Sequence, residues 1–304
     1  MSWVDVVIVN FNTREHLRSC LDSIDRDSAN SVMVVDSTST DGSVDMLRSD
    51  YPWVTVISQP NRGFGAAANR ALEKSDSDYL LLLNSDTVLG ADSVRSLALY
   101  LDEHPAVAVV GPRLLNVDGS LQPSCYPFLT PINVVLVMTL INQFIGSVPV
   151  LRDRHLPTSA HASPRSVPWV KGAALAIRRT ALKSVGGFDE SYFMYSEELD
   201  LCYRLRAVGW DVHFTPSATV RHAGGASTVQ TRAAMSAQEF SSLGRFYRQH
   251  YSPARIVALR VVLTALMSAR IVRDAIRLRR TRDTELRRAL EEDIDVWRKT
   301  LLNG

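Results

Sequence analysis

Cysteine is scarce in this chain. Cys20, Cys125 and Cys202 are odd in number, lie far apart and lack the close spacing of metal-ligand pairs. A disulfide framework would need an even and denser set, and a zinc scaffold would need paired ligands. The pattern therefore favours reduced thiols in the cytosol.

Long uncharged apolar runs are also lacking. No such run reaches the roughly 20 residues of a membrane-spanning helix. The apolar stretch 132–150 is interrupted by Gly146 and Pro149, and we interpret it as a buried or interfacial helix. A strand pattern begins within three residues of Met1, which leaves no room for a signal peptide. We expect a soluble or peripheral protein in the cytoplasm.

Neither sign of charge is in excess. Lys and Arg number 34 against 32 Asp and Glu, and the formal net charge of +2 argues against bulk nucleic-acid binding. The 46% hydrophobic and 22% charged composition is that of a globular protein. With 304 residues, the chain is long enough for one large or two modest domains with a real core.

The segment 79–86 (YLLLLNSD) is central to the prediction. Four leucines followed by Asn84, Ser85 and Asp86 predict a buried strand that delivers a carboxylate at its C-terminal end. In open α/β sheets, ligands bind outside the carboxyl ends of the strands. The alternative is that this polar stretch is only a turn that caps the next helix.

Strands and helices alternate at short spacing through the first half of the chain. This alternation predicts an α/β fold with a mainly parallel sheet flanked by helices and joined by right-handed crossovers. We expect strands at 4–10, 31–36, 53–58, 79–84, 107–111, 167–178 and 211–216, helices at 14–23, 44–48, 66–74, 91–103, 180–185 and from 196, and loops at 152–168 and 220–227.

From residue 233 onward the pattern is helical, with no strand signal. Arginines interleave with apolar and aromatic side chains, which is typical of a basic amphipathic helix at a membrane surface. A solvated helix packed on the rest of the chain, or a contact between two copies, explains the pattern as well. The expected domains are 1–230, with halves 1–115 and 116–230, and a helical extension 231–304.

Several polar segments follow one another in a characteristic order. They are VNFN (9–12), VD with STDGS (35–43), NRGFG with Asn69 (61–69), LNSD (83–86), GGFD (186–189) and EELDLC (197–202). Together they resemble family 2 glycosyltransferases of the Rossmann-like GT-A fold, over residues 4–227. Within that family, the NSDT and EExDLC forms are most similar to bacterial rhamnosyltransferases.

The resemblance implies a nucleotide-sugar donor. Phe11 offers a flat face for a pyrimidine, and core packing is its alternative role. Asp36 can accept a hydrogen bond from the base, and Ser37 stands where the family often has asparagine. Gly63 permits close backbone approach beside a helix N-terminus that favours phosphate. The implied donor-binding residues are Asn10, Phe11, Asn12, Asp36, Asn61, Arg62, Gly63, Asn69, Asn84, Ser85 and Lys171.

The resemblance also implies a divalent cation, Mg²⁺ or Mn²⁺. Asp86 matches the last acid of the family's Asp-x-Asp motif, while Asn84 stands where aspartate is common. The ion then depends more on the donor's diphosphate. His222, in a His-x-x-Gly pattern, matches the family's late metal ligand, and a surface histidine is the alternative.

The implied reaction is displacement at the anomeric carbon with inversion. Glu198 matches the catalytic carboxylate that accepts the proton of the acceptor hydroxyl. Glu197 and Asp200 orient the helix and the acceptor, although plain helix capping also explains acidic residues in a first turn.

Two hypotheses follow. The first is an inverting rhamnosyltransferase that uses dTDP-L-rhamnose, or a relative using another UDP-, dTDP- or GDP-sugar. It would act on a glycan or polyprenyl-linked acceptor at the inner face of the plasma membrane, in cell-wall or surface-polysaccharide synthesis. The second is an inactive nucleotide-binding subunit that supports a partner enzyme.

Overall fold

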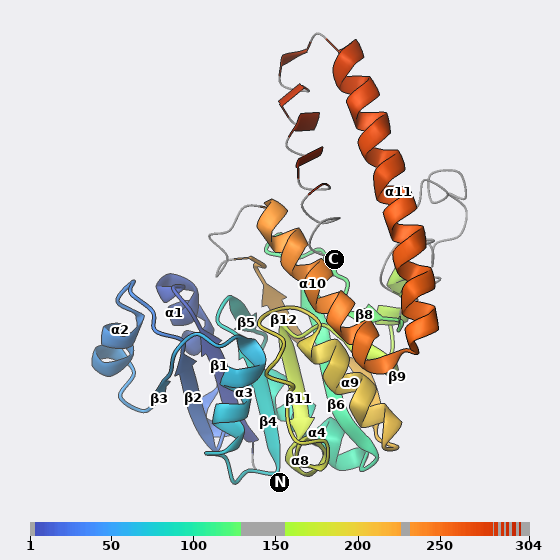
Figure 1. Ribbon diagram of the computed structural model, residues 1–304. Helices are drawn as coiled ribbons and strands as arrows, with labels where there is room; N and C mark the ends of the chain where they lie inside the picture. Colours follow the sequence, from blue (N-terminus) through green and yellow to red (C-terminus); the bar gives the residue numbers. More distant parts are fainter. Residues whose placement is uncertain are drawn as a thin grey trace. The chain divides into compact units, whose positions relative to one another are not determined.

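The computed structural model describes residues 4–128, 156–225 and 232–281, with scattered positions from 283 to 298 (Figure 1). The chain forms two compact units, Met1–Phe128 with His155–Val229 and Leu129–Arg154 with Gln230–Gly304. The helix expected at 132–150 and the first part of the loop at 152–168 lie outside the described residues. The predicted domain boundaries stay a prediction.

One mixed sheet organises the first unit. Its strand order is β3-β2-β1-β4-β11-β6-β12-β5. From β3 to β4 all neighbours are parallel, whereas β11 is antiparallel to both β4 and β6. The carboxyl ends of β1, β2 and β4 therefore share one edge. The strands are β1 (Val4–Asn10), β2 (Ser31–Asp36), β3 (Thr55–Ser58), β4 (Tyr79–Asn84), β5 (Thr87–Leu89), β6 (Val107–Leu115), β11 (Ala174–Arg178) and β12 (Asp211–His222).

Helices cover both faces of this sheet and form two apolar cores. The strand side chains alternate between the two faces, as they must in a pleated sheet. One core is closed by α1 (Arg14–Asp22), α2 (Ser43–Asp50) and α4 (Ser93–Glu103). The other is closed by α3 (Phe64–Leu72), α8 (Arg179–Ser184) and α9 (Glu197–Ala207). The three cysteines are buried and free, which agrees with the absence of a disulfide framework.

Short strands and turns lie around the main sheet. The single strand predicted at 167–178 is found as two strands, a two-residue strand at 169–170 and β11 at 174–178. The short elements are β7 (Leu121–Gln122), β8 (Cys125–Tyr126), β9 (Arg165–Ser166), β10 (Trp169–Val170) and the 3₁₀ turns η1 (Arg26–Ser28) and η2 (Thr158–His161).

The last strand is longer than predicted. We expected this strand to end at 216 and a loop to span 220–227. That expectation is wrong for residues 220–222, which belong to the strand. β12 runs on to His222, and its register against β6 shifts between Thr215 and Thr219. Pro216 lies in this irregularity, where the sheet tolerates a residue that has no backbone N–H to donate. The prediction ended the strand there because the alternation of apolar residues that marks a strand stops at Pro216.

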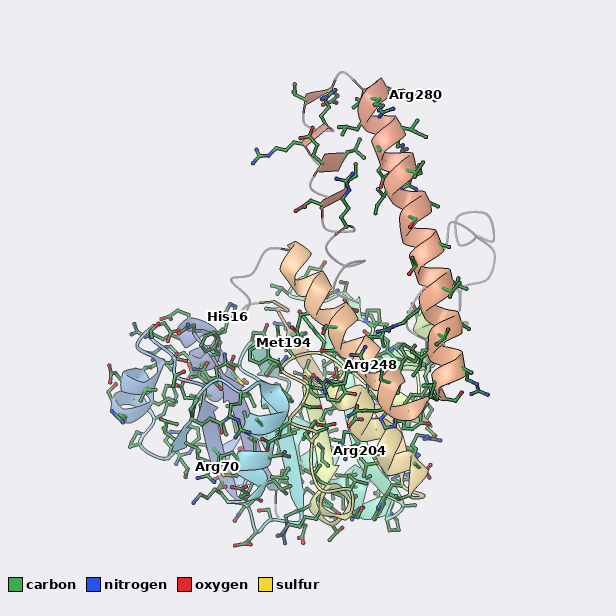
Figure 2. The ribbon with its side chains drawn as sticks, viewed as in Figure 1. His16, Arg70, Met194, Arg204, Arg248 and Arg280 are labelled. Atoms are coloured by element: carbon green, nitrogen blue, oxygen red, sulfur yellow. The ribbon has the colours of Figure 1, made fainter. Side chains whose placement is uncertain are left out.

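The second unit contains two long helices, α10 (Arg232–His250) and α11 (Pro253–Arg280). Pro253 begins α11, a position where its fixed φ suits the helix. Figure 2 labels Arg248 near the end of α10 and Arg280 at the end of α11. Among the described residues, no helix is both long enough and apolar enough to cross a bilayer.

Candidate active site

Polar side chains meet at the carboxyl ends of β1, β2 and β4. Asn10 Nδ2 donates to Asp36 Oδ2 at 2.8 Å. The hydroxyl of Thr13 donates to Asn10 Oδ1 at 2.7 Å and lies 2.6 Å from the hydroxyl of Ser85. The sheet thus joins Asn10, Asp36 and Ser85, which are far apart in the chain.

Asp36 and Asn12 shape the loop that follows β2. Asp36 is 1% exposed, and its Oδ1 accepts from the backbone N–H of Ser39 at 2.9 Å. Asn12 has a left-handed φ of 51°, and its Oδ1 accepts from the N–H of Thr40 at 2.7 Å. Phe11 is half-buried. These bonds hold the loop, and the predicted contacts with a nucleotide base stay a prediction.

The loop before α3 makes close contacts with the segment before α9. Gly63 has a φ of 96°, and a Cβ there would clash with the carbonyl oxygen of Phe193. Asn61 Oδ1 accepts from the N–H of Gly63 at 3.3 Å. Arg62 is exposed and pairs with Glu190 at 2.9 Å. Only glycine fits at position 63, because both the backbone conformation and the close approach exclude a side chain.

Asn69 strengthens the same contact. Its Nδ2 donates to the carbonyl of Phe188 at 2.9 Å and to Glu190 Oε1 at 3.0 Å, while its Oδ1 accepts from the N–H of Phe188 at 2.8 Å. Both ends of the amide are therefore used inside the protein. The predicted contact of Asn69 with the donor, like that of Arg62, stays a prediction.

Asp86 lies in the turn between β4 and β5, and His222 ends β12, the strand that pairs with β5. Thr87, the first residue of β5, pairs with His222 at the end of β12. His222 Nε2 lies 3.3 Å from Asp86 Oδ1 and 3.4 Å from Asn84 Nδ2. Both residues are buried. Carboxylate and amide oxygens suit Mg²⁺ or Mn²⁺, and an imidazole nitrogen is a common metal ligand that can complete such a site. Among the described residues, no three His, Cys, Asp or Glu side chains gather at a metal-sized site.

Lys171 connects this pair to Glu198. Because β11 pairs with β4, the preceding residues 171–173 lie beside the end of β4. The N–H of Gly172 donates to Glu198 Oε1 at 3.2 Å. Burial lowers the pKa of Lys171, and the nearby charges of Glu198 and Asp86 oppose that shift. The fold therefore brings Asp86 and Glu198 within electrostatic reach of one ammonium group.

The two glutamates that begin α9 have different surroundings. In each, Oε2 is buried and has no hydrogen-bond partner among the described residues. Burial, and then the charge of Glu198, raises the pKa of Glu197 well above its usual value. Burial also raises the pKa of Glu198, but the N–H of Gly172 and the charge of Lys171 favour its ionised form. The surroundings of Glu198 therefore include a donor and a cation that stabilise its charged form.

Asp200 has a structural partner. Its Oδ2 lies 2.7 Å from Arg204 Nε, one turn further along α9. Arg204, labelled in Figure 2, also donates to the carbonyls of Val185 and Gly187 at 2.8 and 2.9 Å. The pair fixes α9 to the turn after α8, which fits the predicted role in orienting the helix. The predicted contact with the acceptor stays a prediction.

Sequence reasoning missed Gln122. Its Oε1 lies 2.7 Å from His222 Nδ1 and accepts from Lys171 Nζ at 3.2 Å. Gln122 lies on the two-residue strand β7, outside every motif identified in the sequence. No local signal marks it, because all of these partners are distant in the chain.

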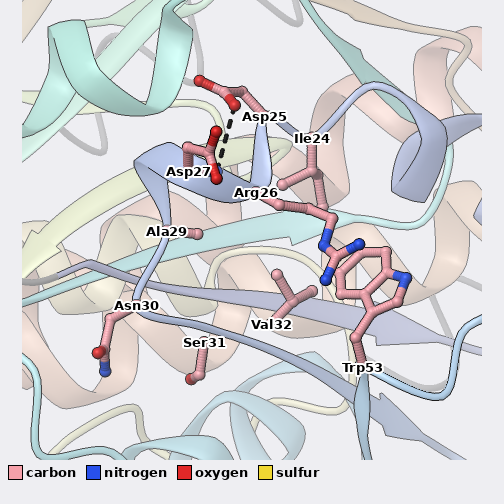
Figure 3. A pocket seen from close by; sticks show the side chains of 9 residues that line it. All are labelled: Ile24, Asp25, Arg26, Asp27, Ala29, Asn30, Ser31, Val32 and Trp53. Carbon is pink, nitrogen blue, oxygen red and sulfur yellow. Dashed lines mark hydrogen bonds between the residues drawn. The ribbon is translucent and has the colours of Figure 1, made fainter.

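A separate cavity of about 600 Å³ lies at the other edge of the sheet (Figure 3). It is lined by residues around the start of β2 and by Trp53, whose ring lies 4.7 Å from the guanidinium of Arg26. These residues are at the amino ends of the parallel strands. The cavity is therefore distinct from the site at the carboxyl ends.

Comparison with known sequences identifies the family of this chain. Residues 2–241 match the family described as "Glycosyltransferase like family 2". The chain is 31% identical to N-acetylglucosaminyl-diphospho-decaprenol L-rhamnosyltransferase of Mycobacterium tuberculosis, over 92% of this chain and 96% of the relative. It is 25% identical to rhamnosyltransferase WbbL of Escherichia coli K12, over 70% of this chain and 81% of that protein.

A solved structure shows the same fold. The mannosyltransferase PcManGT from Pyrobaculum calidifontis, determined with GDP-Man and Mn²⁺, superposes with a TM-score of 0.57. It is 17% identical and covers 99% of this chain and 87% of its own. The fold is the predicted α/β GT-A fold, and the predicted resemblance to rhamnosyltransferases is confirmed. The chain belongs to glycosyltransferase family 2 and is a glycosyltransferase.

Proposed function

We propose that this enzyme transfers L-rhamnose from dTDP-L-rhamnose, with inversion, onto a polyprenyl-diphosphate-linked acceptor in cell-wall or surface-glycan synthesis. The observation that carries the proposal is the 31% identity, over nearly the full length of both chains, to a rhamnosyltransferase named for a decaprenol-linked N-acetylglucosamine acceptor. The 25% identical relative is also a rhamnosyltransferase.

Glu198 is the proposed general base. The acceptor hydroxyl gives its proton to the Glu198 carboxylate, its oxygen forms a bond to the anomeric carbon, and the bond from that carbon to the diphosphate oxygen breaks. The buried Oε2 without a described partner and the Gly172 N–H on Oε1 support this role. A carboxylate held in this way on one side of the sugar favours inversion.

Asp86 and His222 are the residues that would hold Mg²⁺ or Mn²⁺. Their facing oxygen and nitrogen atoms, 3.3 Å apart, fit a shared cation, and the amide of Asn84 is close enough to contribute its oxygen after rotation. When bound, such an ion acts as a Lewis acid on the leaving diphosphate. Lys171 supplies a second positive charge on the same side.

Asn10, Asp36 and Ser85 support the donor site at the adjoining strand ends. The hydrogen bonds that join them preorganise the loops around the expected nucleoside position. Preorganised polar groups need little rearrangement when a ligand binds. We assign the pyrimidine nucleotide to this side and the acceptor to the Glu198 side.

We also propose that α11 binds the anionic inner surface of the plasma membrane, where a lipid-linked acceptor would be found. Val257, Val261, Val272 and Ile276 are exposed and recur every four or eleven residues, so they form one stripe. Exposed Arg255 and other arginines on α11 add positive charge. This combination is typical of interfacial helices.

A donor panel tests the reaction. Purified enzyme is incubated with dTDP-L-rhamnose, UDP-glucose, UDP-N-acetylglucosamine or GDP-mannose, with a synthetic polyprenyl diphosphate N-acetylglucosamine and Mn²⁺, and the released nucleotide is measured. We expect release from dTDP-L-rhamnose above all. Preference for another donor would move the assignment to another sugar, and no release from any donor would favour the inactive-subunit hypothesis.

A further inference from the structure

Gln122 lies where three elements of the site meet. It ends β7, which pairs with the last part of β6 in a hairpin turned by residues 116–120. Lys171 reaches it from the segment before β11, and His222 from the end of β12. One side chain thus contacts both the expected cation ligand and the site's ammonium group.

The orientation of the Gln122 amide is fixed at both ends. Its Nε2 donates to the backbone carbonyl of His222 at 3.2 Å and to Asn116 Oδ1 at 2.9 Å. Its Oε1 accepts from the ammonium of Lys171 at 3.2 Å. A carbonyl can only accept and an ammonium can only donate, so the reversed amide would lose both contacts.

This orientation determines which nitrogen of His222 carries a hydrogen. Nδ1 lies 2.7 Å from Gln122 Oε1, an acceptor, and must therefore donate. In the neutral ring, Nε2 then keeps its lone pair, and this nitrogen lies 3.3 Å from Asp86 Oδ1. Two acceptors that face each other at this distance are suited to hold a cation between them.

We propose that Gln122 is a positioning residue for the cation site: it holds the His222 tautomer that binds a metal and anchors Lys171 beside it. The inference rests on the proposed function, since the cation belongs to that reaction. The inference extends the proposed function, because it adds a residue that supports the two proposed cation ligands, Asp86 and His222. Such supporting hydrogen bonds typically contribute 10- to 100-fold in metal affinity.

The test compares Gln122→Leu and Gln122→Glu with Val117→Ala, an exposed residue in the same hairpin. Leucine removes the acceptor, whereas glutamate retains an oxygen for His222 Nδ1. Binding of Mn²⁺ in the presence of dTDP is measured by electron paramagnetic resonance of the free ion. We expect Gln122→Leu to weaken Mn²⁺ binding by roughly 10- to 100-fold. Val117→Ala should stay close to the wild type, and Gln122→Glu should lose less affinity than Gln122→Leu, because it keeps an acceptor for His222 Nδ1 although it loses the donor to the His222 carbonyl.

Thermal unfolding without metal checks that each variant is folded. Wild-type affinity in a folded Gln122→Leu variant would overturn the inference, and so would equal losses in the Leu and Glu variants. Wild-type protein that binds Mn²⁺ but transfers no rhamnose would contradict the proposed sugar and leave the role of Gln122 intact. Wild-type protein that binds no Mn²⁺ would overturn both the cation site and this inference.

Discussion

His222 Nε2 lies 3.3 Å from Asp86 Oδ1, although the two residues are far apart in the sequence. The contact arises because β12, the last strand in sequence, pairs with β5, which directly follows Asp86. The proposed cation site is therefore a consequence of sheet topology.

Removing the proposed metal ion, or one of its proposed ligands, should strongly lower transfer. Asp86→Asn is expected to lower kcat/KM by roughly 100-fold or more, because a Lewis acid contributes several kcal/mol to such a displacement. EDTA should inactivate the wild type, and Mn²⁺ should restore it. Asp45→Asn on the exposed side of α2 is the control. Full activity of Asp86→Asn in EDTA would contradict the assignment.

Glu198→Gln should lower kcat by roughly 10²- to 10⁴-fold, the usual contribution of a general base, while donor binding is retained. Because burial raises the pKa of Glu198, wild-type kcat should fall with decreasing pH at a pH above the usual glutamate range. Steady-state kinetics from pH 5 to 9 check both expectations. Glu103→Gln, exposed on α4, serves as the control, and equal rates in the two variants would argue against Glu198 as base.

Glu197→Gln should stabilise the protein at neutral pH. The pKa of Glu197 in the folded state is raised well above 4.5 by burial and by Glu198, so the folded state binds the proton more tightly than the unfolded state. Wild-type stability therefore falls as pH rises above the unfolded value. Glutamine imitates the protonated form, and its advantage in thermal unfolding should shrink as pH approaches 4.5. An advantage that does not change with pH would contradict this reading.

Gly63 and Gly119 both have a positive φ, of 96° and 84°. An alanine Cβ at 119 meets nothing within 4 Å, whereas at 63 it would meet the Phe193 carbonyl. Gly119→Ala should cost about 1–2 kcal/mol of unfolding free energy from backbone strain. Gly63→Ala should cost about 1–3 kcal/mol more from overpacking. Urea unfolding measures both, and equal losses would show that the close contact is unimportant.

The apolar stripe of α11 should govern membrane binding. Val261→Asp with Val272→Asp is expected to weaken binding to vesicles containing phosphatidylglycerol by about tenfold or more, since burying one valine contributes about 1.5 kcal/mol. Val208→Asp, on another exposed valine, is the control. Unchanged flotation of the double variant would exclude this face. A change in oligomeric state instead would indicate a contact between copies.

The first four strands and the site at their ends were predictable from local pattern. The apolar runs of β1, β2 and β4 end in Asn10, Asp36 and Asn84, and parallel strands must present such residues at one edge. Alternating strands and helices also imply helices on both faces. These features depend on residues close together in the chain.

The later half of the sheet was not predictable in this way. β11 lies between β4 and β6 and runs antiparallel to both, a pairing that no local pattern reveals. β12 continues past Pro216, so His222 lies on a strand and not in a loop. The partners that tie Gln122 to the site, Lys171 and His222, are distant in the chain, which explains why no motif includes it.

The most direct test is transfer of labelled rhamnose from dTDP-L-rhamnose to polyprenyl diphosphate N-acetylglucosamine, with the product's anomeric configuration determined by nuclear magnetic resonance. We expect a rhamnosylated lipid whose anomeric configuration is opposite to that of the donor. A product with retained configuration, or no rhamnosylated lipid while another sugar nucleotide is consumed, would contradict it.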